Sequence, residues 1–370
     1  MIRSGTPNRS LWSAMLLTML LPSILQAAPG DAPITPNGAV ILQYHFVAED
    51  TPRSTSVTPA EFAAHLDALA EDGFTVVPLD QLLAELRGGI DPPPRTVAIT
   101  FDDGYRSVHE AAFPLLRARK LPFTVFVNTD AIDGGSRTFV SWEALREMQA
   151  AGALVANHSA SHDFLVRRDP AAPREADAAF SARMGREIDG AQARLVAELG
   201  QVPKLFAYPY GEYDDRLRAW LRRAGYLGLG QHSGPVWTGS DFSALPRFPV
   251  SGAYARIDDF REKIRMRPLP VLEADALPDP TDATEDPRPI LTLTLAPSDF
   301  DPARVTCYAS GQGVIPTVLL GLGPDRIEAR APSPVPVGRS RYNCTAQARD
   351  GTWRWFSQPW LRLAADMPAE

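Results

Sequence analysis

The feature that most constrains this fold is an alternation of short apolar runs with amphipathic helical patterns along the middle of the chain. The apolar runs mostly lack the regular polar alternation of strands that have one solvated face, so each predicts a strand buried on both faces. They occupy residues 39–44, 96–101, 123–128, 154–157, 205–208 and 226–230. Such alternation is typical of a parallel β-sheet or barrel covered by helices.

The helical patterns between these runs begin and end at recognisable capping residues. Thr58 and Glu61 form a capping box, with Pro59 at the first helical position. Three further helices, each followed by a glycine, are predicted at 142–151, 180–199 and 215–224. Catalytic residues of such folds gather at the carboxyl ends of the strands, so the residues that follow each apolar run are the candidates for a site.

Proline placement divides the chain. There are 35 prolines in 370 residues, nearly twice the average usage, and several lie among acidic residues in a stretch that predicts an extended linker. Short alternating runs beyond that stretch predict a small sandwich-like β domain. The predicted segments are a signal peptide at 1–27, an N-terminal linker at 28–38, an α/β domain at 39–267, the linker at 268–289 and the β domain at 290–370.

The N-terminus predicts export. Arg3 and Arg9 precede an apolar run that ends before Ala27 and Ala28, which is the order of a secretory signal peptide. We expect cleavage after one of these alanines and a periplasmic or secreted protein with no integral membrane segment afterwards. An uncleaved N-terminal anchor is the alternative, although the run is short for a membrane span.

Export changes the interpretation of the two cysteines, Cys307 and Cys344. In an oxidising compartment, two cysteines within one small β domain favour a disulfide over two free thiols.

The net charge of −7 argues against a nucleic-acid partner, which would require a basic face. The oligomeric state does not follow from the sequence.

Three motifs follow predicted strands, and each has a simpler structural interpretation beside a chemical one. The sequence TFDDGY at 100–105 carries adjacent carboxylates, Asp102 and Asp103, which require a nearby cation or proton; it also fits a turn at a helix start. His158 and His162 have a spacing that can converge on one ion, or they are an incidental pair. The sequence FAYPYG at 206–211 can aim a backbone N–H at an oxyanion, or it is simply a turn.

Together the motifs resemble the polysaccharide deacetylase family, carbohydrate esterase family four, over roughly residues 39–270. The resemblance implies a distorted (β/α) barrel with metal-dependent hydrolase activity on a polysaccharide. It implies that Asp102 is the general base and that Asp103, His158 and His162 hold a divalent metal, usually zinc, with cobalt or nickel also used. It further implies that Tyr210 supplies the oxyanion N–H, and it places Tyr105, Pro209 and Arg247 among the substrate-binding candidates.

The sequence departs from the usual family pattern in two places. Ala207 stands where most members carry an arginine that orients the base, and no histidine follows His232 to supply the usual acid. The sequence QYHFV at 43–47 instead resembles the circularly permuted subgroup that deacetylates poly-β-1,6-N-acetylglucosamine in biofilms. By that resemblance His45 is the preferred catalytic acid over His232. Arg247 either replaces the missing arginine near Asp102 or is a surface residue.

Poly-β-1,6-N-acetylglucosamine-like exopolysaccharide is therefore the favoured substrate. The alternatives are a peptidoglycan or chitin-oligomer deacetylase, and a polysaccharide-binding protein whose deacetylase domain has decayed. The aromatic residues Trp353, Trp355, Phe356 and Trp360 either stack on sugars or form the core of the β domain, and we favour the core. His65 and His109 fall on predicted helical stretches and are expected to be packing or surface residues.

Overall fold

The computed structural model describes residues 1–2, 5, 33–170, 172–277, 286–321 and 325–364. The chain divides into two units, Met1–Ala32 and Pro33–Glu370, and the helices and strands of the described residues all lie in the second unit. The predicted signal peptide, and residues 28–32 of the predicted N-terminal linker, lie outside the described residues apart from residues 1, 2 and 5. Within the described ranges, no helix has both the length and the apolar character needed to cross a bilayer.

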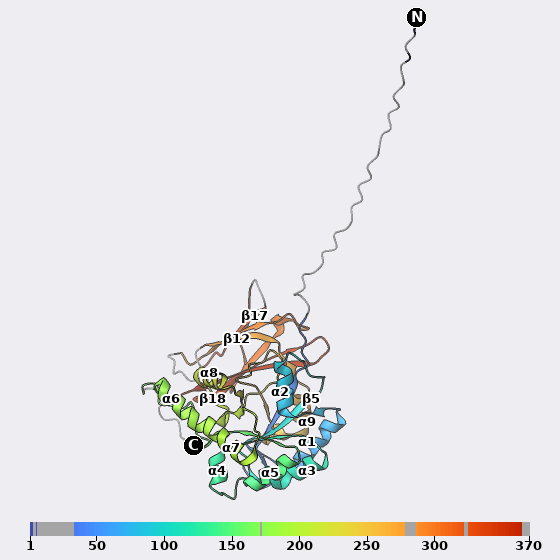
Figure 1. The fold of residues 1–370 in the computed structure, drawn as a ribbon. Helices are drawn as coiled ribbons and strands as arrows, with labels where there is room; N and C mark the ends of the chain where they lie inside the picture. The colour runs from blue at the N-terminus through green and yellow to red at the C-terminus, as the bar shows by residue number, and fades with distance from the viewer. Residues whose placement is uncertain (3–4, 6–32, 171, 278–285, 322–324, 365–370) are drawn as a thin grey trace. The chain divides into compact units, whose positions relative to one another are not determined.

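The predicted parallel sheet is confirmed (Figure 1). Its strands lie in the order β10-β1-β5-β6-β7-β8-β9, with β4 also paired to β5, and every pairing is parallel. The bounds are β1 (Ala39–Tyr44), β4 (Thr75–Val76), β5 (Thr96–Phe101), β6 (Thr124–Val127), β7 (Leu154–Asn157), β8 (Leu205–Ala207), β9 (Leu227–Leu229) and β10 (Phe248–Pro249). The six apolar runs correspond to the longer strands, whereas β4 and β10 are too short to leave a pattern.

The segment 245–249 joins the two edges of this sheet. Leu245 forms a parallel bridge with Leu229 at the end of β9, and Phe248 pairs in parallel with Leu42 of β1. The sheet therefore curves into the distorted barrel that the resemblance implies. Arg247 lies between the two pairings, on the segment that closes the barrel.

Helices pack against both faces of the sheet. Leu42 and Ile99 belong to a cluster with Phe62 and other helix residues, whereas Ile41 and Ala98 belong to a second cluster that includes Leu82 and Leu83. The helices are α1 (Pro59–Glu71), α2 (Leu79–Arg87), α3 (Phe113–Ala118), α4 (Thr129–Asp133), α5 (Trp142–Ala150), α6 (Asp177–Met184), α7 (Ala191–Leu199), α8 (Asp215–Ala224) and α9 (Ile257–Ile264). The capping box at Thr58 is confirmed. The helix predicted at 180–199 is α6 and α7 joined by a π-helical turn, η2 (Gly185–Gly190).

Shorter elements complete the α/β part of the chain. β2 (Phe46–Val47) and β3 (Ser56–Val57) pair with each other directly after β1. A second π-helical turn, η1 (Val108–Ala112), follows the DDGY sequence, and 3₁₀ turns occur at η3 (Pro209–Gly211) and η4 (Gly252–Ala255).

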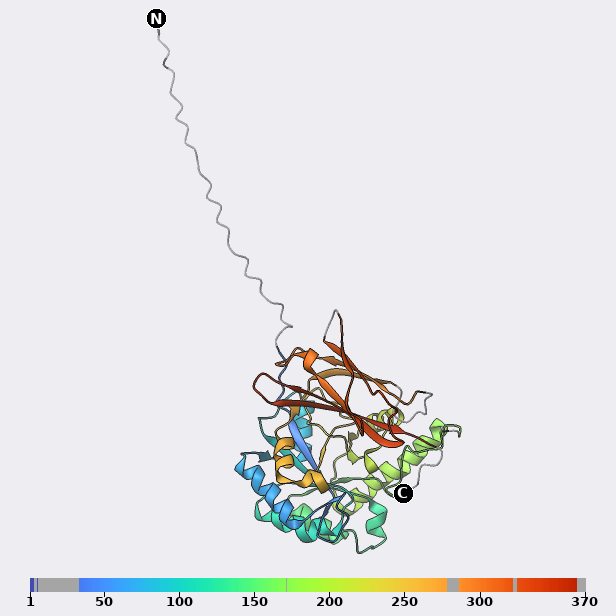
Figure 2. The same ribbon diagram turned by 180° about the vertical axis from the view of Figure 1, so that it is seen from behind.

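The predicted β domain is a pair of sheets with a shared core, drawn in orange and red in Figure 2. One sheet has the order β11-β19-β18-β14-β15 and the other β12-β13-β17-β16. The bounds are β11 (Arg267–Pro268), β12 (Val271–Leu277), β13 (Ile290–Leu295), η5 (Pro302–Arg304), β14 (Thr306–Ala309), β15 (Gly313–Ile315), β16 (Thr317–Leu320), β17 (Arg326–Arg330), β18 (Gly338–Gln347) and β19 (Trp353–Arg362). A disulfide joins Cys307 to Cys344, its directly paired neighbour on β18.

The expectation of an extended linker is wrong for part of its range. Residues Val271–Leu277 form strand β12, which pairs antiparallel with β13, while 278–285 lie outside the described residues. β12 is the edge strand of its sheet, and its acidic residues Glu273 and Asp275 are exposed. Edge strands tolerate charge and nearby proline, so this strand has the composition of a linker.

The aromatic residues of β19 have different environments. Trp360 is buried in the core of the β domain, and Phe356 packs against that core. Trp355 packs against Phe248 of β10, with ring centroids 5.9 Å apart, whereas Trp353 is exposed. This end of the β domain therefore contacts the segment that closes the barrel.

Candidate active site and metal centre

Asp103, His158 and His162 form one cluster at the carboxyl ends of β5 and β7. Their candidate ligand atoms all lie within 4.8 Å of one another. Nε2 of His158 lies 3.0 Å, and Nε2 of His162 3.2 Å, from the same Oδ1 of Asp103. Parallel strands bring their carboxyl ends to one edge, so residues 55 positions apart in the sequence meet here.

The donor atoms fit a divalent metal. Oδ1 of Asp103 and Nε2 of His158 are buried, and neither has a hydrogen-bond partner of acceptable geometry. Nδ1 of His158 lies 2.8 Å from the carbonyl oxygen of Ala207, to which it can only donate, so the neutral ring presents a lone pair at Nε2. Two imidazoles and one carboxylate suit zinc and leave positions for water or substrate.

The electrostatics of the cluster also favour a cation. Burial alone would raise the pKa of Asp103, but its contacts with His158 and His162 hold the pKa well below the ordinary range. Burial opposes protonation of His158, yet the contact with Asp103 raises the pKa of this histidine. The carboxylate thus draws positive charge to this point, and a metal ion there would displace the shared proton.

The site carries unusual backbone conformations. Non-glycine residues rarely adopt positive φ, yet four of the six that do so among the described residues lie here. They are Asp103 (φ 68°), Ser159 (φ 71°), His162 (φ 64°) and Tyr210 (φ 58°). Gly104 also has positive φ, and a Cβ at that position would lie 2.7 Å from Val127. Strained backbone of this kind persists where the surrounding structure holds it, and it concentrates at functional sites.

The π-helical turn η2 holds the loop that carries His162. The Glu187 carboxylate accepts hydrogen bonds from the backbone N–H and the hydroxyl of Ser161, at 3.1 and 2.8 Å. Asn157 donates to the carbonyl oxygen of Ile188 at 2.9 Å. Single π-helical turns frequently occur at functional sites. The sequence does not predict this support, because its pattern does not distinguish Glu187 from any other residue of a helix.

Asp102 is fully buried and paired with Arg247, which is also fully buried. Two parallel hydrogen bonds of 2.7 Å join the guanidinium to the carboxylate. Gln43 of β1 donates a third bond, of 2.6 Å, to Oδ2. Burial alone would raise the pKa of Asp102, but the charges of Arg247 and His158 lower it, so the carboxylate is ionised at neutral pH.

The buried position of Arg247 bears on three expectations: that it binds substrate, that it lies near Asp102, and that it is a surface residue. A side chain with no exposed surface does not contact substrate, so its assignment as a substrate-binding residue is wrong, as is the surface-residue alternative. It occupies the place of a base-orienting arginine near Asp102. Its guanidinium also bonds the carbonyl oxygen of Gly230 and the hydroxyl of Thr100. The sequence singles out Gln43 only as part of the QYHFV motif, without a role.

His45 and His232 have very different surroundings. His45, directly after β1, is partly exposed, and its charge contributes to lowering the pKa values of Asp102 and Asp103. His232 is buried; burial, together with the charges of Arg341, Arg218 and Arg247, lowers its pKa to about 3. His232 is therefore neutral at physiological pH.

Aromatic rings flank the three candidate metal ligands. Tyr105 is half-buried between Phe46 and Phe139, at centroid distances of 3.5 and 5.4 Å, and burial and the Asp103 carboxylate raise its pKa. The Tyr210 ring lies 4.6 Å from that of His162 and is stacked on Phe164 at 3.9 Å. Pro209 is buried at the start of η3, so it shapes the turn.

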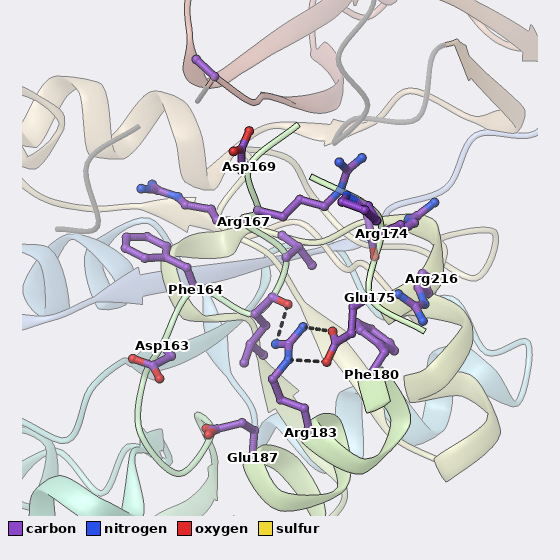
Figure 3. Close-up of a pocket in the computed structure, with 16 residues that line it drawn as sticks. Asp163, Phe164, Arg167, Asp169, Arg174, Glu175, Phe180, Arg183, Glu187 and Arg216 are labelled. Atoms are coloured by element: carbon purple, nitrogen blue, oxygen red, sulfur yellow. Dashed lines mark hydrogen bonds and ion pairs between the residues drawn. The ribbon is translucent and has the colours of Figure 1, made fainter. Parts of the chain in front are cut away.

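A cavity of about 620 Å³ is lined largely by residues between Asp163 and Glu187 (Figure 3). It does not include the three candidate ligands, but its lining starts at Asp163 and Phe164, which directly follow His162. Arg183, on its wall, is paired with Glu175 and also bonds the carbonyl oxygen of Leu165. The wall of the cavity therefore includes charged side chains.

Residues 89–229 match the family model described as "Polysaccharide deacetylase". The chain carries a polysaccharide deacetylase domain. A poly-β-1,6-N-acetyl-D-glucosamine N-deacetylase of Escherichia coli is 24% identical over 295 residues, which are 68% of this chain but only 44% of that protein. Another of that name, from Staphylococcus aureus, is 25% identical over 233 residues, covering 60% of this chain and 78% of that protein.

A solved structure is also similar to this chain. The structure of IcaB from Ammonifex degensii aligns with a TM-score of 0.54 at 28% identity, covering 63% of this chain and 99% of that chain. The family match excludes Gln43, His45 and Arg247, which lie outside residues 89–229. The deacetylase domain is a hydrolase domain. The residues around its Asp102 come partly from both flanks of the matched segment.

Replacing a candidate ligand is expected to weaken metal binding strongly. Loss of an outer-shell partner typically lowers metal affinity about 10–100-fold, so His158→Ala and His162→Ala should each lower it by at least about 100-fold. Elemental analysis and zinc titration of purified variants would measure this. His109→Ala is the matched control, because His109 lies apart from the cluster and pairs with Glu147. Wild-type zinc affinity in both ligand variants would contradict the assignment.

Proposed function

We propose that this protein removes N-acetyl groups from an N-acetylglucosamine-containing polysaccharide, with a poly-β-1,6-N-acetylglucosamine-like exopolysaccharide as the favoured substrate. The observation that carries the proposal is the Asp102–Arg247 pair, fully buried directly beside the Asp103–His158–His162 cluster. An ionised carboxylate next to a candidate metal centre is the arrangement required to activate water.

Asp102 acts as the general base. A divalent ion held by Asp103, His158 and His162, most simply Zn²⁺, supplies Lewis-acid activation of water and of the acetyl carbonyl when bound. Oδ1 of Asp102 accepts one bond from Arg247, and a carboxylate oxygen can accept a second. That remaining position can take the proton of the attacking water, while Arg247 and Gln43 fix the carboxylate in place.

Tyr210 and His45 complete the reaction. The backbone N–H of Tyr210, in the left-handed turn after β8, is proposed to donate to the oxyanion that forms at the acetyl carbon. Protonated His45 is proposed to donate a proton to the departing amine nitrogen, which is otherwise a poor leaving group. His232, buried and neutral at physiological pH, is not in the imidazolium form that a general acid requires.

The named relatives support the proposed substrate. Two of them are poly-β-1,6-N-acetyl-D-glucosamine N-deacetylases by name, and the cavity beside Phe164 offers room beyond the reacting sugar for a polymer. Peptidoglycan and chitin-like oligomers remain the alternative substrates. The geometry of the cluster argues against a decayed, binding-only domain, because its donor atoms still converge. The disulfide fits action outside the cytoplasm.

The Asp102→Asn variant is expected to lose at least about 100-fold in kcat, in the range typical of a missing general base. The amide is nearly isosteric but cannot accept the proton of water at neutral pH. Acetate release measures the rate, and elemental analysis should find an unchanged metal content. Asp130→Asn is the control, since Asp130 is an exposed carboxylate. Wild-type activity in Asp102→Asn would overturn the base assignment.

The two candidate acids can be separated directly. His45→Ala is expected to lower kcat about 100-fold or more, whereas His232→Phe should retain most of the activity if it folds. A substrate with a good leaving group, such as an aryl acetate ester, needs no protonation and should be cleaved by His45→Ala at near the wild-type rate. Equal losses on both substrates would count against His45 as the acid.

Substrate choice is testable with a panel. Acetate release from poly-β-1,6-N-acetylglucosamine, chitin oligomers and peptidoglycan should be fastest for the first. A chelator should abolish it, and added Zn²⁺, Co²⁺ or Ni²⁺ should restore it. Faster release from a β-1,4-linked polymer would favour the alternative substrates. No release from any of the three with metal bound would reject the proposed activity.

A further inference from the structure

The hairpin formed by β18 and β19 reaches the turn that carries Tyr210. Nη1 of Arg339, near the start of β18, donates a 2.7 Å hydrogen bond to the carbonyl oxygen of Tyr210. Nε of Arg339 also lies 3.8 Å from Oε1 of Glu212, two residues further along the turn. The two residues in this hydrogen bond are 129 positions apart, on the α/β domain and the β domain.

The turn at Tyr210 needs external support. Tyr210 has φ 58° and ψ 2°, in the left-handed region, which side chains with a Cβ rarely adopt. Gly211 follows with φ 70°, and a Cβ there would lie 2.6 Å from Gln231. Such a backbone holds its shape only where its surroundings fix it. A hydrogen bond to the Tyr210 carbonyl fixes the orientation of the peptide that follows it.

Glu212 anchors the other side of the turn. Its side chain is only 1% exposed, and it accepts bonds of 2.9 and 2.7 Å from Nε and Nη2 of Arg167. Arg167 in turn stacks over Phe164, the ring that packs on Tyr210. Arg339 therefore approaches a turn that the Glu212 carboxylate already holds. It adds a contact to the backbone of that turn.

The same hairpin also contacts the second segment that serves the site. Arg341 donates to the hydroxyl of Ser233 at 3.3 Å, and Trp355 donates to the carbonyl oxygen of Ser233 at 2.9 Å. Ser233 follows His232, whose carbonyl oxygen accepts the backbone N–H of Arg247. One hairpin thus contacts both the Tyr210 turn and the segment next to the partner of Asp102.

We propose that Arg339 is a positioning residue for the reaction and that the β domain is part of the catalytic unit. Arg339 holds the Tyr210 turn so that the backbone N–H of Tyr210 meets the developing oxyanion. The inference rests on the proposed role of Tyr210. It gives the β domain a function that does not depend on binding carbohydrate.

The test compares Arg339→Met, Arg339→Lys and the control Arg349→Met. Arg349 is exposed in the turn at the opposite end of the same hairpin. Loss of an entire oxyanion donor costs about 100- to 1,000-fold in kcat, so a misplaced donor in Arg339→Met should cost about 10-fold with KM unchanged. Arg339→Lys should recover part of this, because its ammonium can still donate to the carbonyl. Arg349→Met should match the wild type.

Hydrogen exchange provides a readout that does not need substrate. Exchange in residues 208–213, measured by mass spectrometry, should rise in Arg339→Met and stay at the wild-type level in Arg349→Met. Unchanged exchange in Arg339→Met would overturn the inference whatever the activity. A rise in KM alone would overturn it too, by making Arg339 a substrate contact. An inactive wild type would reject the proposed function, while raised exchange would still establish that Arg339 holds the turn.

Discussion

The buried ion pair of Asp102 and Arg247 is the interaction on which the site depends. Neither side chain has exposed surface, and an unpaired charge at such a place would be strongly destabilising, since removing one partner of a buried pair typically costs about 3–5 kcal/mol. The guanidinium comes from the segment 245–249, which joins β9 to β1. Closing the barrel therefore also brings the guanidinium to the Asp102 carboxylate, and the proposed base is in place only when the fold is complete.

Whether a feature of the fold or site can be predicted from the sequence depends on how far apart in the sequence its interacting residues lie. The strands, the capped helices and the positions of Asp102, Asp103, His158 and His162 at strand ends depend on local patterns, which the sequence displays. The partner of Asp102 depends on a contact between residues 145 positions apart, and no local pattern around Arg247 distinguishes it from a surface arginine. The β12 strand has the composition of a linker because its edge position permits charged residues and nearby proline, so its local pattern predicts the wrong structure.

Backbone strain accounts for another part that sequence patterns could not predict. Asp103, Ser159, His162 and Tyr210 adopt positive φ although residue propensity favours other conformations for all four. Their surroundings impose these conformations: Glu187 holds the loop of His162 through Ser161, and Arg339 holds the turn of Tyr210. Both supports come from distant parts of the chain, and neither residue belongs to a motif.

These contacts also bear on what constitutes the functional unit. The segment that matches the family model, 89–229, contains the candidate metal ligands and Asp102. It lacks Gln43 and Arg247, which hold Asp102, the proposed base, and His45, the proposed acid. It also lacks Arg339, which bonds the Tyr210 turn. Since a buried carboxylate without its guanidinium would be protonated or displaced, the matched segment alone carries the candidate ligands without the means to keep the proposed base ionised. The unit that can perform the proposed chemistry therefore extends from β1 to β18.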